Sequence, residues 1–566
     1  MNIPAIYGLL LTSERKKSIL LVYFFFAPLE RNGEFVSKTK LIRILCGVIL
    51  AGVLFVEGLA FSLVYGLNML PTEYLILLAA FLLVLWVGLA ALMFIPGRKK
   101  KTLGLGRGIA AALLVAIILF GCTLASSVVA ELQRTLNDIS TPTELTAEVD
   151  LFVRVDDPAQ KLEDAADYVF AITEYYDIEN TMKAIEQLEA TYGKKITTIT
   201  YDHVYAMADA LYAGQADAML INTAYISILV EGEGYTDFMS KAKLLSQIDI
   251  RIVVQPPTED NKKDPLDWLI PDKTEPVETT QPVETDTWIQ VPEGKVTDVP
   301  FVVYLAGNDY KGEGFGTYSK NDVNILAVIN PKTKQILMIN TPRDYYIPNP
   351  AGNGALDKLT HCGARGVENS MRAISEFYQV PIRYYAQIGF SGLKELVDAV
   401  DGVTVYSDYS YIALDEVPIQ KGKNHLNGEE ALAFARDRKN VDGGDNTRGN
   451  HQMKVVKALI DKMISGKIFT RYADIMKSLR GLFRTSIPTE DMASLVQMQL
   501  NDMATWNIVS YAVTGTSGRG LTYSEPLYPN LFIYYPNMDT VEYARELMQR
   551  IIDGEIIQQS DIIPAD

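Results

Sequence analysis

Residues 324–346 read Asn-Ile-Leu-Ala-Val-Ile-Asn-Pro-Lys-Thr-Lys-Gln-Ile-Leu-Met-Ile-Asn-Thr-Pro-Arg-Asp-Tyr-Tyr. Two apolar runs, 324–329 and 335–340, predict strands because both are short, rich in Ile and Leu, and bounded by polar residues. The connection between them, Asn-Pro-Lys-Thr-Lys, is rich in turn-forming residues and predicts a hairpin. The second strand leads directly into Arg343, in a position where loops commonly carry functional side chains.

Further elements surround this hairpin in the sequence. A β-branched and aromatic run at 301–306 predicts another strand, and apolar spacing predicts helices near 366–378, 391–400, 448–465, 489–503 and 538–552. Another helix begins at Asn427, and Glu430 three residues on completes a capping box. Strands mixed with helices on this scale predict an α/β sandwich with one sheet over 298–552, followed by a tail, 553–566.

The N-terminal part of the chain predicts three transmembrane helices within 44–130. The runs 44–67, 74–95 and 108–130 are apolar and each is about 20 residues long, enough to cross a hydrocarbon core. Glu57 interrupts the first run, either as a functional carboxylate or as a group that faces a neighbouring helix.

Basic residues predict the orientation of these helices. They precede the first run and fill the second loop: Arg15, Lys16, Lys17, Lys38, Lys40, Arg43, Arg98, Lys99, Lys100, Lys101 and Arg107. By the positive-inside rule, residues 1–43 and the second loop are cytoplasmic, and everything after about residue 130 is extracellular. The sequence therefore predicts a multi-pass protein of the cell membrane with a large extracellular C-terminal region.

Residues 145–255 predict a small α/β accessory domain. Helix-like spacing covers 160–192, strand-like runs lie at 196–201, 218–221 and 248–254, and 207–212 is again helical. No charged cluster within it indicates catalysis, so binding, packing or assembly is the expected role. Residues 256–297 alternate proline with Thr, Glu and Asp and predict an extended linker.

Charge and cysteine usage narrow the functional classes. The net charge of −17 argues against a nucleic-acid partner, because such binding needs a basic face. Cys46 and Cys122 lie in apolar runs, so Cys362 is the one cysteine of the extracellular part. It follows His361, but neighbours in sequence do not have the geometry that activates a thiol, and a small semi-buried side chain is the preferred interpretation.

Three separated segments each carry arginines: Thr-Pro-Arg-Asp (341–344), Phe-Ala-Arg-Asp-Arg (434–438) and Asn-Thr-Arg-Gly-Asn-His-Gln (446–452). Asp309 and Asp322 stand upstream of them. Guanidinium groups that converge with free carboxylates suit a phosphate or pyrophosphate ester held with a divalent cation. The plainer alternative is that the arginines form surface salt bridges, with the neighbouring acidic residues Asp344, Asp437 and Asp445.

Residue spacing constrains how the arginines meet. Arg448 and Gln452 are four apart in a predicted helix and project from one face. Arg436 and Arg438 are two apart, so they can touch one ligand only if the helix ends near Arg436 and the chain then extends. Asp437 and the glycines that follow make that ending plausible.

The motifs of 298–470 resemble those of the LytR-CpsA-Psr family of Gram-positive cell envelopes. The resemblance rests on Gly307-Asn308-Asp309, Asn321-Asp322, Thr341-Pro342-Arg343-Asp344, Lys358-Leu359-Thr360-His361, Leu426-Asn427-Gly428-Glu429-Glu430-Ala431-Leu432, Ala435-Arg436-Asp437-Arg438, Arg448 and Gln452. Three spans followed by an accessory domain look like the CpsA-type branch. The resemblance implies a sandwich domain with a central mixed sheet.

The family's activity implies a Mg²⁺-dependent (or Mn²⁺-dependent) phosphotransferase-type ligase. It would transfer a capsular or teichoic-acid-like glycopolymer from a polyprenyl-pyrophosphate carrier to peptidoglycan at the cytoplasmic membrane. Asp309 and Asp322 would hold the metal ion. The groups that would bind the pyrophosphate are Lys320, Arg343, Arg436, Arg438, Arg448 and Gln452, and those assigned to catalysis are Arg343, Asp344, Arg436 and Arg438.

Two departures from the family pattern are visible. Lys320 stands where relatives usually carry arginine, which keeps the charge but loses the bidentate fork. Tyr310 and Lys311 stand where an arginine often follows the first motif aspartate.

The role of Asp344 has two interpretations: it orients or deprotonates the acceptor hydroxyl, or it pairs with Arg343. An apolar face of Leu393, Leu396, Val397 and Val400 could line a groove for the polyprenyl tail, or form ordinary core. Two alternative functions use the same site. One is a non-catalytic regulator of polymer length or export, and the other is a polyprenyl-pyrophosphate hydrolase.

Overall fold

The computed structural model describes residues 38–95, 105–140, 144–173, 177–253, 293–308, 319–441, 443–465, 471–526 and 530–565. Asp309, nearly all of the predicted linker 256–297 and most of the predicted N-terminal segment 1–43 lie outside these described residues. The chain divides into two compact units, Met1–Gln133 with 496–501, and 134–495 with 502–566.

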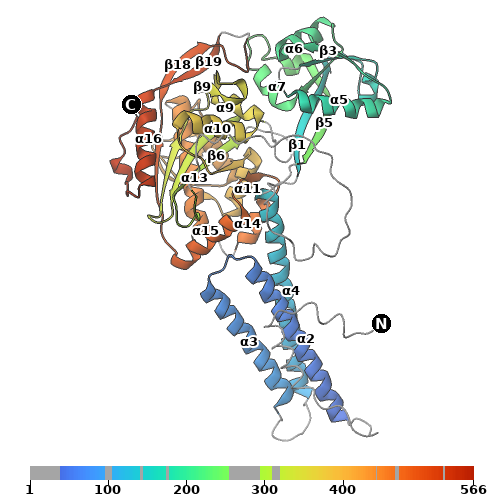
Figure 1. The fold of residues 1–566 in the computed structure, drawn as a ribbon, viewed down its shortest axis with the longest axis vertical. Helices are drawn as coiled ribbons and strands as arrows, with labels where there is room; N and C mark the ends of the chain where they lie inside the picture. Colours follow the sequence, from blue (N-terminus) through green and yellow to red (C-terminus); the bar gives the residue numbers. More distant parts are fainter. Residues whose placement is uncertain are drawn as a thin grey trace. The chain divides into compact units, whose positions relative to one another are not determined.

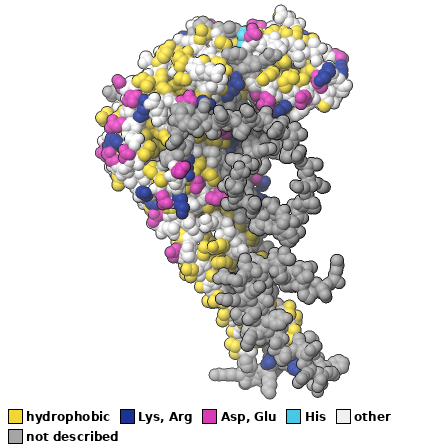
Figure 2. Space-filling model, in the orientation of Figure 1, with side chains coloured by type: hydrophobic (Ala, Val, Ile, Leu, Met, Phe, Trp, Pro, Cys, Tyr) yellow, Lys and Arg dark blue, Asp and Glu magenta, His cyan; other side chains and the backbone are white. Residues whose placement is uncertain are grey.

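The first unit contains three long helices, drawn in blue in Figure 1: α2 (Lys38–Gly66), α3 (Thr72–Phe94) and α4 (Leu105–Ser140). Each is long and apolar enough to cross a membrane, with mean hydropathy of 2.4, 2.9 and 2.5 over the candidate spans. Hydrophobic side chains cover the part of these helices that grey atoms leave in view (Figure 2). Glu57 is only 3% exposed and lies on the packed side of α2.

The second unit begins with a five-stranded sheet in the order β3-β2-β4-β1-β5. Its strands are β1 (Glu144–Arg154), β2 (Val169–Thr173), β3 (Thr197–Tyr201), β4 (Ala218–Asn222) and β5 (Ala242–Val253). Its longer helices are α5 (Ile178–Tyr192), α6 (Val204–Ala213) and α7 (Thr223–Leu229), drawn with the sheet in cyan to green in Figure 1. Ala184 and Leu188 of α5 pack against Val149 and Leu151 on one face, and α6 and α7 cover the other.

The predicted helical stretch 160–192 is wrong in its first half. Residues Leu162–Ala165 form one 3-10 turn and Val169–Thr173 is strand β2, so that only Ile178–Tyr192 is helical. The error has a physical reason: β2 is a short strand between two others, four of its five residues are buried, and such a continuous apolar run cannot be distinguished from a buried helix by periodicity.

The larger sheet has six strands in the order β16-β11-β6-β7-β8-β17. They are β6 (Phe301–Asn308), β7 (Asn321–Asn330), β8 (Gln335–Asn340), β11 (Tyr384–Ile388), β16 (Phe483–Thr485) and β17 (Asn507–Ala512). Pairs β6–β11 and β8–β17 are parallel, whereas β6–β7, β7–β8 and β11–β16 are antiparallel. The predicted hairpin and the central mixed sheet are confirmed.

Helices cover both faces of this sheet because strand side chains alternate between the faces. Val302, Tyr304 and Leu326 point into a core with α10 (Val367–Tyr378) and α16 (Met538–Ile552). The opposite face carries α11 (Phe390–Ala399), α12 (Gly428–Arg436) and α13 (Gly444–Met463), which surround a pocket with Leu305.

Smaller elements complete the second unit. They are β9 (Tyr346–Asn349), β10 (Ala355–Lys358), α8 (Phe238–Lys241), α9 (Leu359–Cys362), β12 (Val403–Ser407), β13 (Tyr411–Ala413), β14 (Val417–Ile419), β15 (Gly422–Leu426), α14 (Tyr472–Leu479), α15 (Thr489–Asp502), β18 (Gly515–Gly520) and β19 (Leu531–Pro536).

The topology brings the predicted site to one edge of the larger sheet. Strand β7 is antiparallel to both β6 and β8, so it begins where its two neighbours end. Asn321 and Asp322 therefore start β7 beside the end of β6, and the Thr-Pro-Arg-Asp segment follows the end of β8 at the same edge.

Candidate functional site

Arg343 is fixed at this edge by its own backbone. The N–H of Thr341 donates to the carbonyl of Asn324 at 2.9 Å, which continues the β7–β8 ladder, and the N–H of Thr360 donates to the carbonyl of Arg343 at 2.8 Å. The side chain of Arg343 donates through Nη1 to Oδ1 of Asp322. Its Nε lies 3.6 Å from Oδ2 of Asp344. Arg343 is thus held among carboxylates at the start of β7.

Helix α12 ends where the arginine spacing requires. Its last residue is Arg436, and Asp437 is extended, with φ −67° and ψ 130°. The buried Asp437 carboxylate accepts the N–H groups of Leu414 at 2.9 Å, Lys439 at 2.9 Å and Asn440 at 3.1 Å. This fixes the extended chain, so that Arg436 and Arg438 line one pocket.

Helix α13 brings the third segment to the same place. It begins at Gly444, four residues before Arg448, so Arg448 and Gln452 lie one turn apart on its inner face and both line the pocket. Gly449 permits the approach, because a Cβ there would lie 2.2 Å from Nδ2 of Asn340 at the end of β8. Arg448 pairs with Asp445 at 2.5 Å.

One pocket, of roughly 670 Å³, joins these groups to an apolar groove. Its polar end carries Asp322, Arg343, Arg436, Arg438, Arg448 and Gln452. Its apolar walls come from α11, α12 and α13, and include Leu393, Leu396, Val456, Leu459, Ile460 and Met463. Leu393 and Leu396 thus line the groove as one sequence interpretation had it, whereas Val397 and Val400 are buried in the core.

Two contacts shape the electrostatics of the polar end. The Arg436 guanidinium lies 4.3 Å from the centre of the Phe390 ring, a cation–π contact at the junction of the polar and apolar parts. Burial alone would lower the pKa of Arg343, but the carboxylates of Asp322, Asp344 and Glu231 outweigh burial and raise it. Arg343 is therefore a permanent cation.

Asp322 fits the predicted Mg²⁺ site in part. Asp322 lines the pocket. Within the described residues, its Oδ1 atom accepts hydrogen bonds from Arg343 Nη1 and from Thr360 Oγ1, the latter at 3.3 Å. Carboxylate oxygens are ligands that Mg²⁺ prefers. Asp309, the other predicted ligand, lies outside the described residues.

Lys320 and Asp344 lie beside the pocket, not among its lining residues. The Nζ of Lys320 donates to the carbonyl of Ser227 at 3.0 Å and to Oε1 of Glu231. Oδ1 of Asp344 lies 3.7 Å from Nζ of Lys358. Two of the three predicted acidic partners, Asp344 and Asp445, do pair with arginines.

Glu231 is the residue that the sequence did not indicate. It follows α7 of the smaller sheet, yet its carboxylate reaches Lys320, Nζ of Lys358 at 2.7 Å and Nη2 of Arg343 at 3.6 Å. Burial would raise its pKa, but His361 and the two lysines lower the pKa well below the ordinary value of 4.5. Nothing in its local sequence, Val-Glu-Gly-Glu-Gly, marks this carboxylate.

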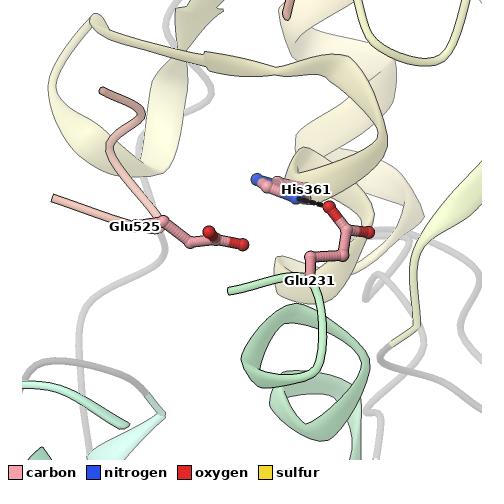
Figure 3. A group of neighbouring side chains, drawn as sticks. All are labelled: Glu231, His361 and Glu525. Atoms are coloured by element: carbon pink, nitrogen blue, oxygen red, sulfur yellow. Dashed lines mark ion pairs between the residues drawn. The ribbon is translucent and has the colours of Figure 1, made fainter. Parts of the chain in front are cut away.

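His361, Glu231 and Glu525 form a group that could hold a metal ion. The three side chains converge in Figure 3, where the dashed line marks the 3.6 Å ion pair between His361 Nε2 and Glu231 Oε2. Cys362, beside His361, is fully buried, and burial raises its pKa well above the usual 9.0. Its Sγ faces the carbonyl of Lys358 at 3.8 Å, as a structural thiol would.

Comparisons with known proteins find similar sequences and structures. The model of the LytR_cpsA_psr family matches residues 271–534. A polyisoprenyl-teichoic acid–peptidoglycan teichoic acid transferase TagU from Enterococcus faecalis is 32% identical over 197 residues, which are 35% of this chain and 64% of that protein. The TagU of Bacillus licheniformis is 34% identical over 194 residues, 34% of this chain and 62% of that protein.

A crystal structure of B. subtilis TagV is 26% identical and covers 45% of this chain and 98% of that chain, with a TM-score of 0.38. The present chain spans less than two thirds of the length of the two TagU relatives. The class of protein is defined by the α/β domain and by its pocket, in which guanidinium groups meet an apolar groove. Residues 271–534 are similar to the LytR-CpsA-Psr family.

Proposed function

We propose that the chain transfers a glycopolymer from a polyprenyl-pyrophosphate carrier to peptidoglycan. The observation that carries this proposal is the continuity of the pocket: four arginines and a glutamine at one end, and the apolar walls of α11 and α13 at the other. A ligand that fills both ends has an anionic head joined to a long hydrocarbon tail, which is the chemistry of a polyprenyl pyrophosphate.

The roles of the residues follow from phosphoryl-transfer chemistry. The acceptor hydroxyl forms a bond to the phosphorus that bears the sugar, and the bond from that phosphorus to the bridging oxygen breaks, so that polyprenyl phosphate leaves. Arg343, Arg436, Arg438 and Arg448 neutralise the charge on the phosphate oxygens, and Gln452 donates a further hydrogen bond. Asp344 orients the acceptor hydroxyl or takes up its proton, or it serves only to hold Arg343.

Asp322, with Asp309, would hold the divalent cation, and Mg²⁺ is the ion we propose there, with Mn²⁺ as the alternative. The ion would supply charge neutralisation at the pyrophosphate. We also propose that Lys320 reaches the pyrophosphate when Glu231 moves away from it.

Topology gives the proposed setting. The basic N-terminal segment and second loop are cytoplasmic in this proposal, and both α/β regions are extracellular, where peptidoglycan is. The three spans and the five-stranded accessory region favour the CpsA-type branch. The TagU relatives are named as teichoic acid transferases, so an anionic, teichoic-acid-like or capsular polymer is the proposed donor.

The test uses the full chain in detergent with a polyprenyl-pyrophosphate-linked oligosaccharide and peptidoglycan oligomers. We expect labelled glycan and released polyprenyl phosphate, both lost in Arg436→Ala and unchanged in Lys423→Ala, an exposed cation on β15. Turnover that persists in Arg436→Ala would contradict the proposal. Release without labelling would instead indicate the hydrolase, in which water replaces the acceptor.

A second variant tests the groove separately. Val456→Trp places a large ring on the inner wall of α13. Donors with a short prenyl chain should still react, whereas long polyprenyl donors should lose most of their activity. Equal losses for short and long donors would show that the tail does not occupy this groove.

A second candidate function is non-catalytic regulation of polymer length or export. One observation favours it: Glu231 from the accessory region lies among the cations Lys320, Lys358 and Arg343. A carboxylate there competes with a phosphate for the same positive charge. If Glu231→Gln alters polymer length in cells while attachment to peptidoglycan is preserved, the accessory region regulates and the pocket transfers.

A further inference from the structure

We propose that Glu231, His361 and Glu525 bind one divalent transition-metal ion of the Zn²⁺ or Mn²⁺ type, at a site separate from the pocket carboxylates. The ligand atoms of the three residues all lie within 4.8 Å of one another. They come from three distant parts of the chain, namely the loop after α7, helix α9 and the segment between β18 and β19. The proposal does not depend on the transferase activity.

The strongest sign of a missing ligand is the Glu525 carboxylate. Glu525 is 0% exposed, and neither of its oxygens makes a hydrogen bond within the described residues. Burying a carboxylate is costly, and burial raises the pKa of Glu525 to about 7, although His361, Tyr205 and Lys358 act to lower it. Figure 3 shows this carboxylate pointing toward His361 and Glu231.

His361 is oriented as metal-binding histidines are. Its Nδ1 lies 2.9 Å from Oδ1 of Asp357, and the other Asp357 oxygen accepts hydrogen bonds from Asn349 Nδ2 at 3.0 Å and Ser524 Oγ at 2.6 Å. The far nitrogen, Nε2, is buried and faces Oε2 of Glu231 at 3.6 Å. A carboxylate that fixes one imidazole nitrogen while the other faces an ion is the usual outer-sphere arrangement of a metal site.

The ligand set selects the kind of ion. Mg²⁺ and Ca²⁺ prefer oxygen ligands alone, whereas an imidazole nitrogen with carboxylates suits Zn²⁺ and Mn²⁺-type ions. Glu231 Oε2 is shared with Lys358 Nζ at 2.7 Å, and Lys320 occupies Oε1. Asp357 favours a proton on His361. A bound ion therefore has to displace that proton.

The site joins two regions of the chain. Glu231 belongs to the region of the five-stranded sheet, whereas His361 and Glu525 belong to the region of the six-stranded sheet. A bound ion would hold Glu231 beside Lys320 and Lys358.

The test is a metal titration of the full chain in detergent, stripped with EDTA and free of donor substrate. Isothermal titration with Zn²⁺, Mn²⁺ and Mg²⁺ should give one Zn²⁺ or Mn²⁺ per chain, and Mg²⁺ should not displace it. Glu525→Gln keeps the size of the side chain, so it should fold and should weaken binding at least tenfold. Glu231→Gln should do the same, and exposed Glu233→Gln, in the same loop, should bind as the unaltered chain does.

Three results would overturn the proposal: no Zn²⁺ or Mn²⁺ uptake, equal affinity in Glu525→Gln, or binding lost in Asp322→Asn but kept in Glu525→Gln. The last result would assign the ion to the pocket. Because no donor or acceptor is present, these outcomes are distinct from a failure of the transferase proposal, which is read from glycan labelling.

Discussion

Glu231→Gln tests whether the Glu231 carboxylate of the accessory region pairs with Lys320 and Lys358. Lys320 and Lys358 are 4% and 3% exposed, so this carboxylate neutralises two ammonium groups that are almost wholly removed from water. With Lys358 at 2.7 Å, attraction at a dielectric constant of about 20 is about 6 kcal/mol before desolvation is subtracted. Breaking one partner of a buried pair costs roughly 3–5 kcal/mol. The amide keeps one acceptor oxygen, so we expect the lower end, about 3 kcal/mol.

The assay is urea unfolding of the full chain in detergent with EDTA present, so that no metal ion contributes. Glu233→Gln is the matched control, since it lies two residues away and is exposed. The folded pKa of Glu231 is lowered, so its contribution is complete above the ordinary value of 4.5 and is lost as the pH falls toward the folded value. The difference between Glu231→Gln and the unaltered chain should therefore shrink in acid.

A double-mutant cycle with Lys320→Met makes the test specific. Because the two side chains bond directly, the double variant should be less destabilised than the sum of the single variants, by roughly 1–3 kcal/mol. A cost below about 1 kcal/mol for Glu231→Gln, equal to that of Glu233→Gln and without coupling to Lys320, would refute the reasoning.

Further predictions follow from other parts of the chain. Burial raises the pKa of Asp150 from 3.8 to about 6 despite a hydrogen bond from Gln247, so ionisation of Asp150 destabilises the fold as the pH rises from about 4 to 6. By thermal unfolding, Asp150→Asn should be about 3 kcal/mol more stable than the unaltered chain at pH 7 and equally stable below pH 4. Gly449→Ala should push α13 away from Asn340, cost about 1–3 kcal/mol and weaken inorganic pyrophosphate binding by titration calorimetry; unaltered affinity would contradict the close approach. Cys362 should resist iodoacetamide in the folded chain and react after denaturation, as read by mass spectrometry; labelling in the folded state would disprove its burial.

Much of the pocket was predictable from local sequence. The Asn-Pro-Lys-Thr-Lys turn determines the hairpin, the Asn427–Glu430 capping box starts α12, and the spacing of Arg436 and Arg438 requires that helix to end where it does. Each of these signals acts over a few residues. A short sequence pattern determines which side chains a turn or helix end presents. Because these segments lie at one edge of the sheet, their arginines then come together.

What could not be predicted depends on contacts between distant segments. Glu231 meets Lys320 across 89 residues, and no short motif encodes such a meeting. Glu525 likewise could not be predicted, because it meets His361 and Glu231 only in the folded chain. The strand β2 was missed for a related reason: burial on both faces, which only the complete sheet provides, removes the alternation by which a strand is recognised.

The separation of these contacts has a consequence for the order of assembly. Ser524 and Asp357, which anchor the Glu525 segment beside His361, are 167 residues apart, and closing so long a loop carries an entropic cost before any contact forms. During synthesis the Glu231 region is complete long before residue 525 has been added to the chain. We expect the five-stranded sheet to fold first and the group of Glu231, His361 and Glu525 to form last. A chain that ends before residue 525 should therefore keep the strand pairings of both sheets but lack this group.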